Sequence, residues 1–184
     1  ELQPPGAEPL TLDEMKLHLR VQHDADDALI SSLIASARQI CEQETRRSLI
    51  TRTYALFLDC WPSDTSISLP HPPLVSVTLV QTYDVVNTAT TFSSANYFVD
   101  ALGSTPRLVM TSSPPTAGRD ANGIEIRYTA GYGATPAQVP HALRQGIKQL
   151  VTYLYENRGD DAAHALHASG AATLFQPYRV MGLL

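Results

Sequence analysis

The sequence predicts an α+β fold in which a helical core is interrupted by an antiparallel, β-rich insertion. The main observation is that the spacing of apolar residues changes twice along the chain. It is close to 3.6 residues over 29–41, which is typical of one helix face, and returns to that spacing over 143–154. Between these segments the apolar residues alternate with a period of two, which is typical of strands.

Two helices are expected before the insertion. Thr11 and Glu14 form a capping box, which predicts a first helix over 12–20. Asp24 is suited to the N-cap of a second helix that runs to about residue 46. The apolar stripe of this second helix consists of Leu29, Ile30, Leu33, Ile34, Ala37, Ile40 and Cys41.

The clearest strand of the insertion is 74–83. Val75, Val77 and Leu79 lie on one of its faces, and Ser76, Thr78 and Thr82 lie on the other. Further strands are predicted at 53–59, 67–69, 97–100, 107–110 and 124–129.

A third helix is expected to begin near Pro140, a residue that fits the first helical position. Gly146 lies within it and costs about 1 kcal/mol relative to Ala, so we interpret it as a point of close approach by another helix. The buried stripe of this helix consists of Leu143, Ile147, Leu150, Val151 and Leu154. The predicted organisation is an extended N-terminal arm (1–10), a helical core (11–52 and 130–160), a β-rich insertion (53–129) and an extended arm as the C-terminal tail (161–184).

Composition excludes several classes of protein. The 184 residues have a net charge of −5, which argues against a protein that binds nucleic acid with high affinity. No apolar run approaches the roughly 18 residues that span a bilayer, so no membrane association is expected. Charged residues make up 17% of the chain, against about 25% in typical proteins. Such a surface is expected either to contact other protein or simply to be rich in Ser and Thr.

No catalytic residue and no cofactor site is predicted. Gly131-Tyr132-Gly133 lacks the third glycine of a phosphate loop and is interpreted as a turn between strand and helix. Cys41 lies in an apolar stripe, which favours an inert core thiol. Cys41 and Cys60 form no disulfide framework, which fits synthesis in a reducing cytoplasm.

One cluster has ligand-type residues. Asp160, Asp161, His164 and His167 can share a helix face, and such residues bind zinc. A zinc site usually needs a further ligand and supporting hydrogen bonds, which nothing else in the chain clearly supplies. We therefore predict no metal and interpret the segment as solvated or as part of an interface. A small metal-binding protein remains an alternative.

The tail is unusually apolar for a chain end. Either it folds back on its own core or it docks onto a partner, and the second interpretation is favoured. Its binding residues would be Leu174, Phe175, Pro177, Tyr178, Arg179, Val180, Met181, Leu183 and Leu184.

Four segments carry a family resemblance. In order they are LTLDEMKLHLRVQHDADDALISSLIASARQICEQETRRSLITRTYALFLDCWP, ISLPHPPLVSVTLVQTYD, IEIRYTAGYGATPAQVPHALRQGIKQLVTYLYENR and PYRV. Together they cover nearly the whole chain and resemble the head–tail connector proteins of long-tailed phages and gene transfer agents. These are also called adaptor or head-completion proteins.

The resemblance implies a structural virion protein with no enzymatic activity. Such proteins are made in the host cytoplasm and act at the head–tail joint. They form a ring of about twelve copies beneath the portal protein. In this ring one face of each copy meets a different face of the next copy. The ring extends the channel through which genomic DNA passes without sequence-specific binding, and it offers a platform for a stopper or tail-completion protein.

The resemblance also gives the tail a partner, the portal. For contacts between copies, the charges opposite the apolar stripes are the candidates. These are Arg38, Arg46, Arg144 and Lys148. A non-virion assembly or interaction module, such as an assembly chaperone, is the alternative function.

Overall fold

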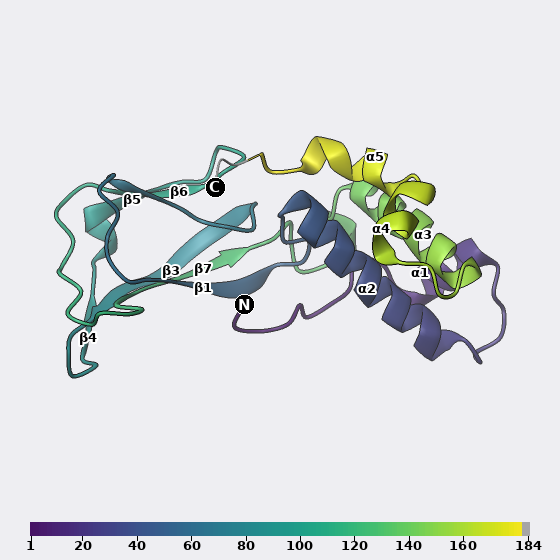
Figure 1. Ribbon diagram of the computed structural model, residues 1–184, viewed down its shortest axis with the longest axis horizontal. Coiled ribbons are helices and arrows are strands. Elements are labelled where there is room, and N and C mark those ends of the chain that lie inside the picture. The colour runs from purple at the N-terminus through teal and green to yellow at the C-terminus, as the bar shows by residue number, and fades with distance from the viewer. Residues whose placement is uncertain (182–184) are drawn as a thin grey trace. The chain divides into compact units, whose positions relative to one another are not determined.

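A computed structural model describes residues 1–181 and confirms the α+β fold class, with helices and antiparallel sheets (Figure 1). The chain divides into two compact units. The β unit contains Glu1–Pro4 and Thr51–Gly131, and the helical unit contains Pro5–Ile50 and the segment from Tyr132 onward. The β unit is therefore inserted between the second and third helices of the helical unit.

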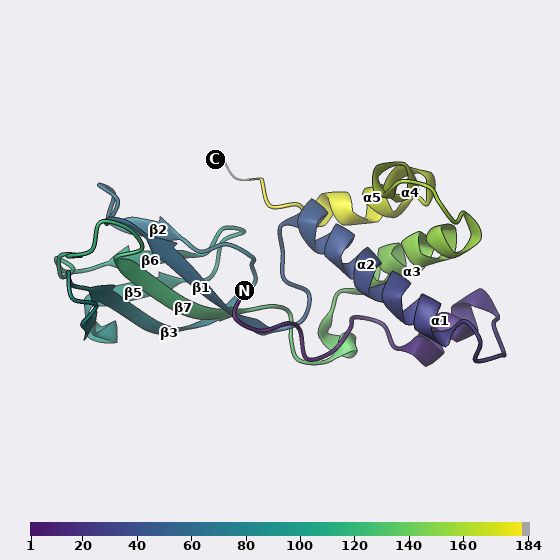
Figure 2. The same ribbon diagram turned by 60° about the horizontal axis from the view of Figure 1, so that its bottom comes forward.

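The helical unit is built on two long helices, α2 (Asp27–Thr45) and α3 (His141–Glu156), which lie side by side (Figure 2). Their apolar stripes meet in one core, where Ile34 is 2% exposed and Leu150 is fully buried. Thr11 caps the first helix with the predicted capping box. The helices are α1 (Leu12–Leu19), α2 (Asp27–Thr45), α3 (His141–Glu156), α4 (Ala162–Ala168) and α5 (Ala171–Phe175).

The tail differs from the extended arm that we predicted, because residues 162–175 form α4 and α5. Asp161 caps α4 by accepting a hydrogen bond from the His164 amide at 2.8 Å. Gly170 then turns the chain with φ of 78°, a conformation that glycine adopts without a steric cost. Apolar spacing does not predict this turn, because the short segment between the two helices is polar.

Gly146 provides the close approach that the sequence predicts. Phe175 of α5 packs on the backbone of α3 at this position and is 1% exposed. A Cβ atom at Gly146 would lie 2.4 Å from Cε1 of the Phe175 ring. The absent side chain therefore creates the space into which the tail packs.

The β unit consists of two antiparallel sheets with a core between them (Figures 1 and 2). One sheet has the order β1-β7-β3-β4 and the other has the order β2-β6-β5. The strands are β1 (Arg52–Leu58), β2 (Ser66–Ser68), β3 (Leu74–Tyr83), β4 (Ala89–Thr91), β5 (Tyr97–Asp100), β6 (Arg107–Met110) and β7 (Ile124–Ala130). The sequence did not predict β4, which is short and has all three residues exposed.

Simple alternation fails in β3. Two register shifts interrupt its pairing with β7, between Leu74 and Ser76 and between Val77 and Leu79. A bulge adds a residue to one strand and changes which side chains face the core. As a result Val75 is 59% exposed, whereas Thr82 is buried.

Glu125 is a buried carboxylate in β7, with 2% of its surface exposed. It accepts hydrogen bonds from the Tyr83 hydroxyl at 2.5 Å, from Gln81 Nε2 at 2.8 Å and from the Arg127 guanidinium. Burial raises the pKa of this carboxyl, but the hydrogen bonds and the charge of Arg127 outweigh burial and lower the pKa below its ordinary value. The network thus holds a charged group at the junction of β3 and β7.

Gly146→Ala is expected to destabilise the protein by about 1–3 kcal/mol, because the added methyl group collides with the Phe175 ring. This reverses the usual order in helices, where Ala is favoured over Gly by about 1 kcal/mol. Denaturant unfolding measures the effect, with Gln145→Ala on the exposed side of α3 as the control. In the double variant with Phe175→Leu the cost should be smaller than the sum of the two single costs. Strict additivity would contradict the contact.

Glu125→Gln is expected to lower the free energy of unfolding at pH 7 by about 1.5–3 kcal/mol, the range for hydrogen bonds to a charged group. The folded-state pKa is lowered, so the carboxylate stabilises the protein above its ordinary pKa. That stability is lost as the pH falls through the lowered value. Between pH 7 and pH 3, the free energy of unfolding should change less with pH for Glu125→Gln than for the unmodified chain. Asp64→Asn, which removes an exposed carboxylate of the same unit, is the control for the loss of one negative charge.

Candidate interaction surfaces

The buried half of the predicted tail surface packs within its own subunit. Phe175 fills the core beside Gly146, and Leu174 and Tyr178 are partly buried against the same core. In the folded subunit Phe175 is therefore not available as the partner anchor that the sequence analysis proposed. The physical reason is the space above Gly146, which apolar spacing along the tail does not reveal.

The exposed half begins after the 3-10 turn Gln176–Tyr178. Pro177 and Arg179 are exposed, Val180 is half-buried, and Met181 is 92% exposed. The predicted residues Leu183 and Leu184 lie outside the described residues. Among residues 174–181, the exposed residues are Gln176, Pro177, Arg179 and Met181.

The C-terminal end of α2 holds this segment in place. The Arg47 Nε donates a hydrogen bond to the Tyr178 carbonyl at 2.6 Å, and the Val180 amide donates to the Thr45 carbonyl at 3.0 Å. An ion pair joins Arg179 to Glu44 at 3.6 Å. We call these contacts the tail clip. A shallow hollow of about 350 Å³ lies beside the clip and is lined by Glu44, Arg46, Arg179, Val180 and Met181.

Arg38 does not lie on an open surface. Its side chain is 7% exposed and forms ion pairs with Glu8 at 2.7 Å and with Glu42 at 2.9 Å. It therefore joins the segment before α1 to α2 within one subunit, in place of the contact between copies that we predicted. The charge pattern alone placed Arg38 opposite the apolar stripe, and it did not show that the N-terminal segment covers it.

Arg144 has a similar role on α3. Its guanidinium donates to the Pro9 carbonyl at 3.1 Å and to the Glu14 carboxylate. Burial raises the pKa of Glu14, but the Thr11 amide and the Arg144 guanidinium outweigh burial and lower that pKa below its ordinary value. Of the four predicted residues for contacts between copies, Arg46 is exposed and Lys148 is half-exposed.

The predicted ligand cluster forms a hydrogen-bonded corner after α3. The Tyr153 hydroxyl donates to Asp160 at 2.7 Å, and the His164 ring lies 3.1 Å from the same carboxylate. These two groups lower the pKa of Asp160. Asp161 is occupied in capping α4, and His167 is exposed on the same helix. In residues 1–181 no three His, Cys, Asp or Glu side chains are grouped to bind a metal ion.

The two cysteines lie in different surroundings. Burial raises the pKa of the Cys41 thiol, as its place in the α2 stripe predicts. Cys60 is exposed at the end of β1. Among the helices of residues 1–181, none has the length and apolar character needed to cross a bilayer.

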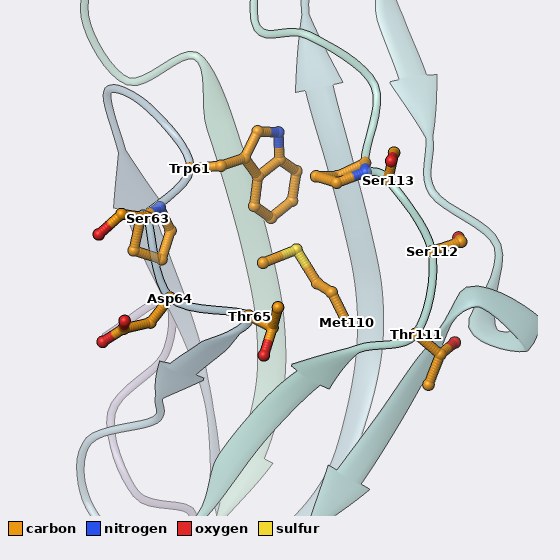
Figure 3. A pocket seen from close by; sticks show the side chains of 10 residues that line it. Trp61, Ser63, Asp64, Thr65, Met110, Thr111, Ser112 and Ser113 are labelled. Carbon is orange, nitrogen blue, oxygen red and sulfur yellow. The ribbon is translucent and has the colours of Figure 1, made fainter.

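The β unit carries a hollow of about 430 Å³ between the loop that follows β1 and the loop that follows β6. The side chains of Trp61 and Met110 face each other at its floor (Figure 3). Trp61 is anchored by a hydrogen bond from its indole Nε1 to the Pro115 carbonyl at 2.8 Å. Polar side chains form most of the rim, and we call this feature the Trp61–Met110 hollow. The rest of its lining consists of Ser63, Asp64, Thr65, Thr111, Ser112 and Ser113, together with Pro62 and Pro114.

Comparisons with known proteins agree on one class. The sequence profile of a family described as phage gp6-like head-tail connector protein matches residues 9–105. Solved chains from gene transfer agent (GTA) particles cover 100% of this chain and 96% of their own length. A chain from the neck of an empty GTA particle, computed with C6 symmetry, has 28% identity and a TM-score of 0.82. A chain from the virion of the native GTA particle has 26% identity and a TM-score of 0.82.

The neck of the native GTA particle, computed with C12 symmetry, contains a chain with 27% identity and a TM-score of 0.79. Among curated proteins, none matches at a significant level.

Arg47→Ala is expected to release residues 179–181 from α2 without unfolding the helical core, because Arg47 supports the tail clip and is not among the buried residues that α2 and α3 share. Hydrogen exchange of the Val180 amide should become faster by at least tenfold, since its partner carbonyl on Thr45 no longer faces a fixed segment. Arg46→Ala is the control, because its guanidinium has no hydrogen bond or ion pair among the described residues. Equal exchange rates in both variants would contradict the clip.

Proposed function

Because the chain belongs to the phage gp6-like head-tail connector protein family, we propose that it is a structural component of the neck in a phage-like particle, at the joint between head and tail. The observation that carries the proposal is the match of the entire chain to neck proteins of a GTA particle with a TM-score of 0.82. The family is structural and not enzymatic. This agrees with the roles of the charged residues of the helical unit, which mostly fix its own segments.

In this role, copies of the chain form a ring. The related neck that was computed with C12 symmetry supports about twelve copies. A ring requires contacts in which two different faces of each subunit meet. Arg46 and Lys148 are available for such contacts, because they remain on the surface of the helical unit. Arg38 and Arg144 support the ring indirectly by fixing the segment before α1.

The ring extends the DNA channel of the head and offers a platform for a stopper or tail-completion protein. A conduit must let DNA move, so it must avoid many contacts between cations and phosphates, which would hold the cargo. The net charge of −5 per copy supports this role. Genomic DNA therefore passes through the ring without sequence-specific binding.

The exposed end of the tail contacts the portal. Arg179, Val180 and Met181 lie where the tail clip presents them, and the predicted Leu183 and Leu184 follow in the chain. A clipped segment loses less conformational freedom when it binds than a free one does, so more of its contact energy is retained as affinity. Met181 offers a flexible apolar side chain that adapts to a partner groove.

A truncation that ends at Tyr178 tests both the proposed role in the neck and the proposed contact of the tail with the portal. It keeps Phe175 in the core, so the melting temperature should change by no more than a few degrees. Particles made with this variant should contain portal-bearing heads that lack the protein, as measured by mass spectrometry of purified particles. The full-length chain should be present in stoichiometric amounts.

The outcomes separate the alternatives. If the full-length chain is absent from particles, the protein is an assembly factor and the proposed virion role is wrong. If the truncated chain joins heads as well as the full-length chain does, the tail is not the portal contact.

A further inference from the structure

We propose that Val85 and Val86, at the tip of the β3–β4 hairpin, form a contact between neighbouring copies by seating in the Trp61–Met110 hollow of the next subunit. This inference rests on the proposed ring and names the surfaces that two adjacent β units use. It is independent of the tail and of the exposed charges on the helical unit.

The tip is unusual in composition and exposure. Hairpin turns favour Gly, Asn and Asp, whereas two β-branched apolar residues occupy the centre of this one. Val85 is 79% exposed and Val86 is 74% exposed. Single exposed apolar residues are common, but two adjacent ones at a projecting tip form an anchor that a partner can cover.

The backbone of the tip is rigidly held. The Asp84 carboxylate accepts hydrogen bonds from the Val86 amide at 2.9 Å and from the Thr88 amide at 2.8 Å. The Asp84 amide donates to the Thr88 carbonyl at 3.1 Å, and Asn87 adopts a left-handed conformation with φ of 64°. None of these bonds uses the valine side chains, so the valines are presented by the turn and do not build it.

A second loop braces the tip from the side. The Arg119 guanidinium lies over the Tyr83 ring at 4.5 Å and donates to the Asn87 side-chain oxygen at 3.1 Å. The Gly118 amide donates to the Tyr83 carbonyl at 2.9 Å, and a Cβ at Gly118 would lie 2.9 Å from the Asp84 Cα. A surface loop with this much support is pre-organised, which lowers the entropy lost on docking.

The Trp61–Met110 hollow has the complementary character. Its floor is apolar and its rim is mostly polar, which is the usual arrangement at the centre of a protein interface. Its volume of about 430 Å³ lies within the range of about 300–1,000 Å³ that is typical of ligand pockets. Trp61 is fixed by its bond to the Pro115 carbonyl and by packing against Phe92, so the floor does not collapse when the site is empty.

A second copy is the occupant that fits these observations. In a cyclic ring every projecting contact on one side of a subunit needs a different, receptive surface on the other side. The turn 84–88 and the hollow share no lining residue, because the hollow is built from 61–65 and 110–114. One subunit can therefore offer its tip to the next copy while its own hollow receives the tip of the preceding copy.

Cross-linking in assembled particles tests the contact directly. Val86→Cys and Ser112→Cys are combined in a chain in which exposed Cys60 is replaced by Ser, and particles are treated with a short bismaleimide. We expect a ladder of covalent multiples of this chain on a denaturing gel. Leu102→Cys with Ser112→Cys is the matched control, because Leu102 is 99% exposed at a different turn, and it should remain monomeric. Cross-links to another protein, or none, would overturn the proposal.

Val85→Ser with Val86→Ser tests the energetic role. The turn keeps its backbone bonds, so the isolated variant should melt within a few degrees of the unmodified chain. Its incorporation into particles, in competition with unmodified chain, should fall about tenfold or more, since hot-spot side chains contribute at least that factor. Leu102→Ser should compete equally. Equal incorporation of the double variant would refute the contact, whereas absence of the unmodified chain from particles would instead refute the proposed neck function.

Discussion

The structure depends on the pairing of the two chain segments that leave and re-enter the helical unit. Within that unit Ile50 forms a bridge with Gly133, and the Tyr132 amide donates to the Leu49 carbonyl at 3.2 Å. Within the β unit the same two segments continue as β1 and β7, which pair along their full length. Loop-closure entropy grows only slowly with length, so this closure lets α2 and α3 share one core although the whole β unit separates them in sequence.

The tail shows how one apolar segment can serve two purposes. Its first part packs within the subunit, because Gly146 leaves room for the Phe175 ring against the α3 backbone. Its last described residues leave the core and are held by backbone bonds at the end of α2. A segment anchored in this way remains attached to its subunit while it presents Met181 to solvent. The boundary between the two roles is the 3-10 turn Gln176–Tyr178.

Arginine is used mainly inside each unit. Arg38 and Arg144 fix the segment before α1, Arg47 fixes the tail, and Arg52 forms an ion pair with Glu1 at 3.1 Å. A guanidinium suits this task because its several fixed donors can bond carbonyls and carboxylates at once. The exposed surface also carries apolar side chains. The hairpin valines and Met181 are examples.

The sequence by itself determined the elements with strong local signals and the identity of the family. Thr11 and Glu14 cap α1, the stripes of α2 and α3 are buried, and the alternating insertion forms antiparallel sheets, because helix capping and apolar periodicity act within a few residues. Four segments in order were enough for the family, which the profile match and the solved chains confirm.

Tertiary structure decided which of those side chains face outward. Bulges in β3 leave Val75 exposed, the segment before α1 covers Arg38, and the space over Gly146 takes Phe175 into the core. The Val85–Val86 tip and the Trp61–Met110 hollow also emerge only when loops distant in sequence meet, as Arg119 does with Asn87. Each outcome is a contact between residues far apart in the chain. The physical reason is that apolar periodicity reports only on neighbours along one helix or strand.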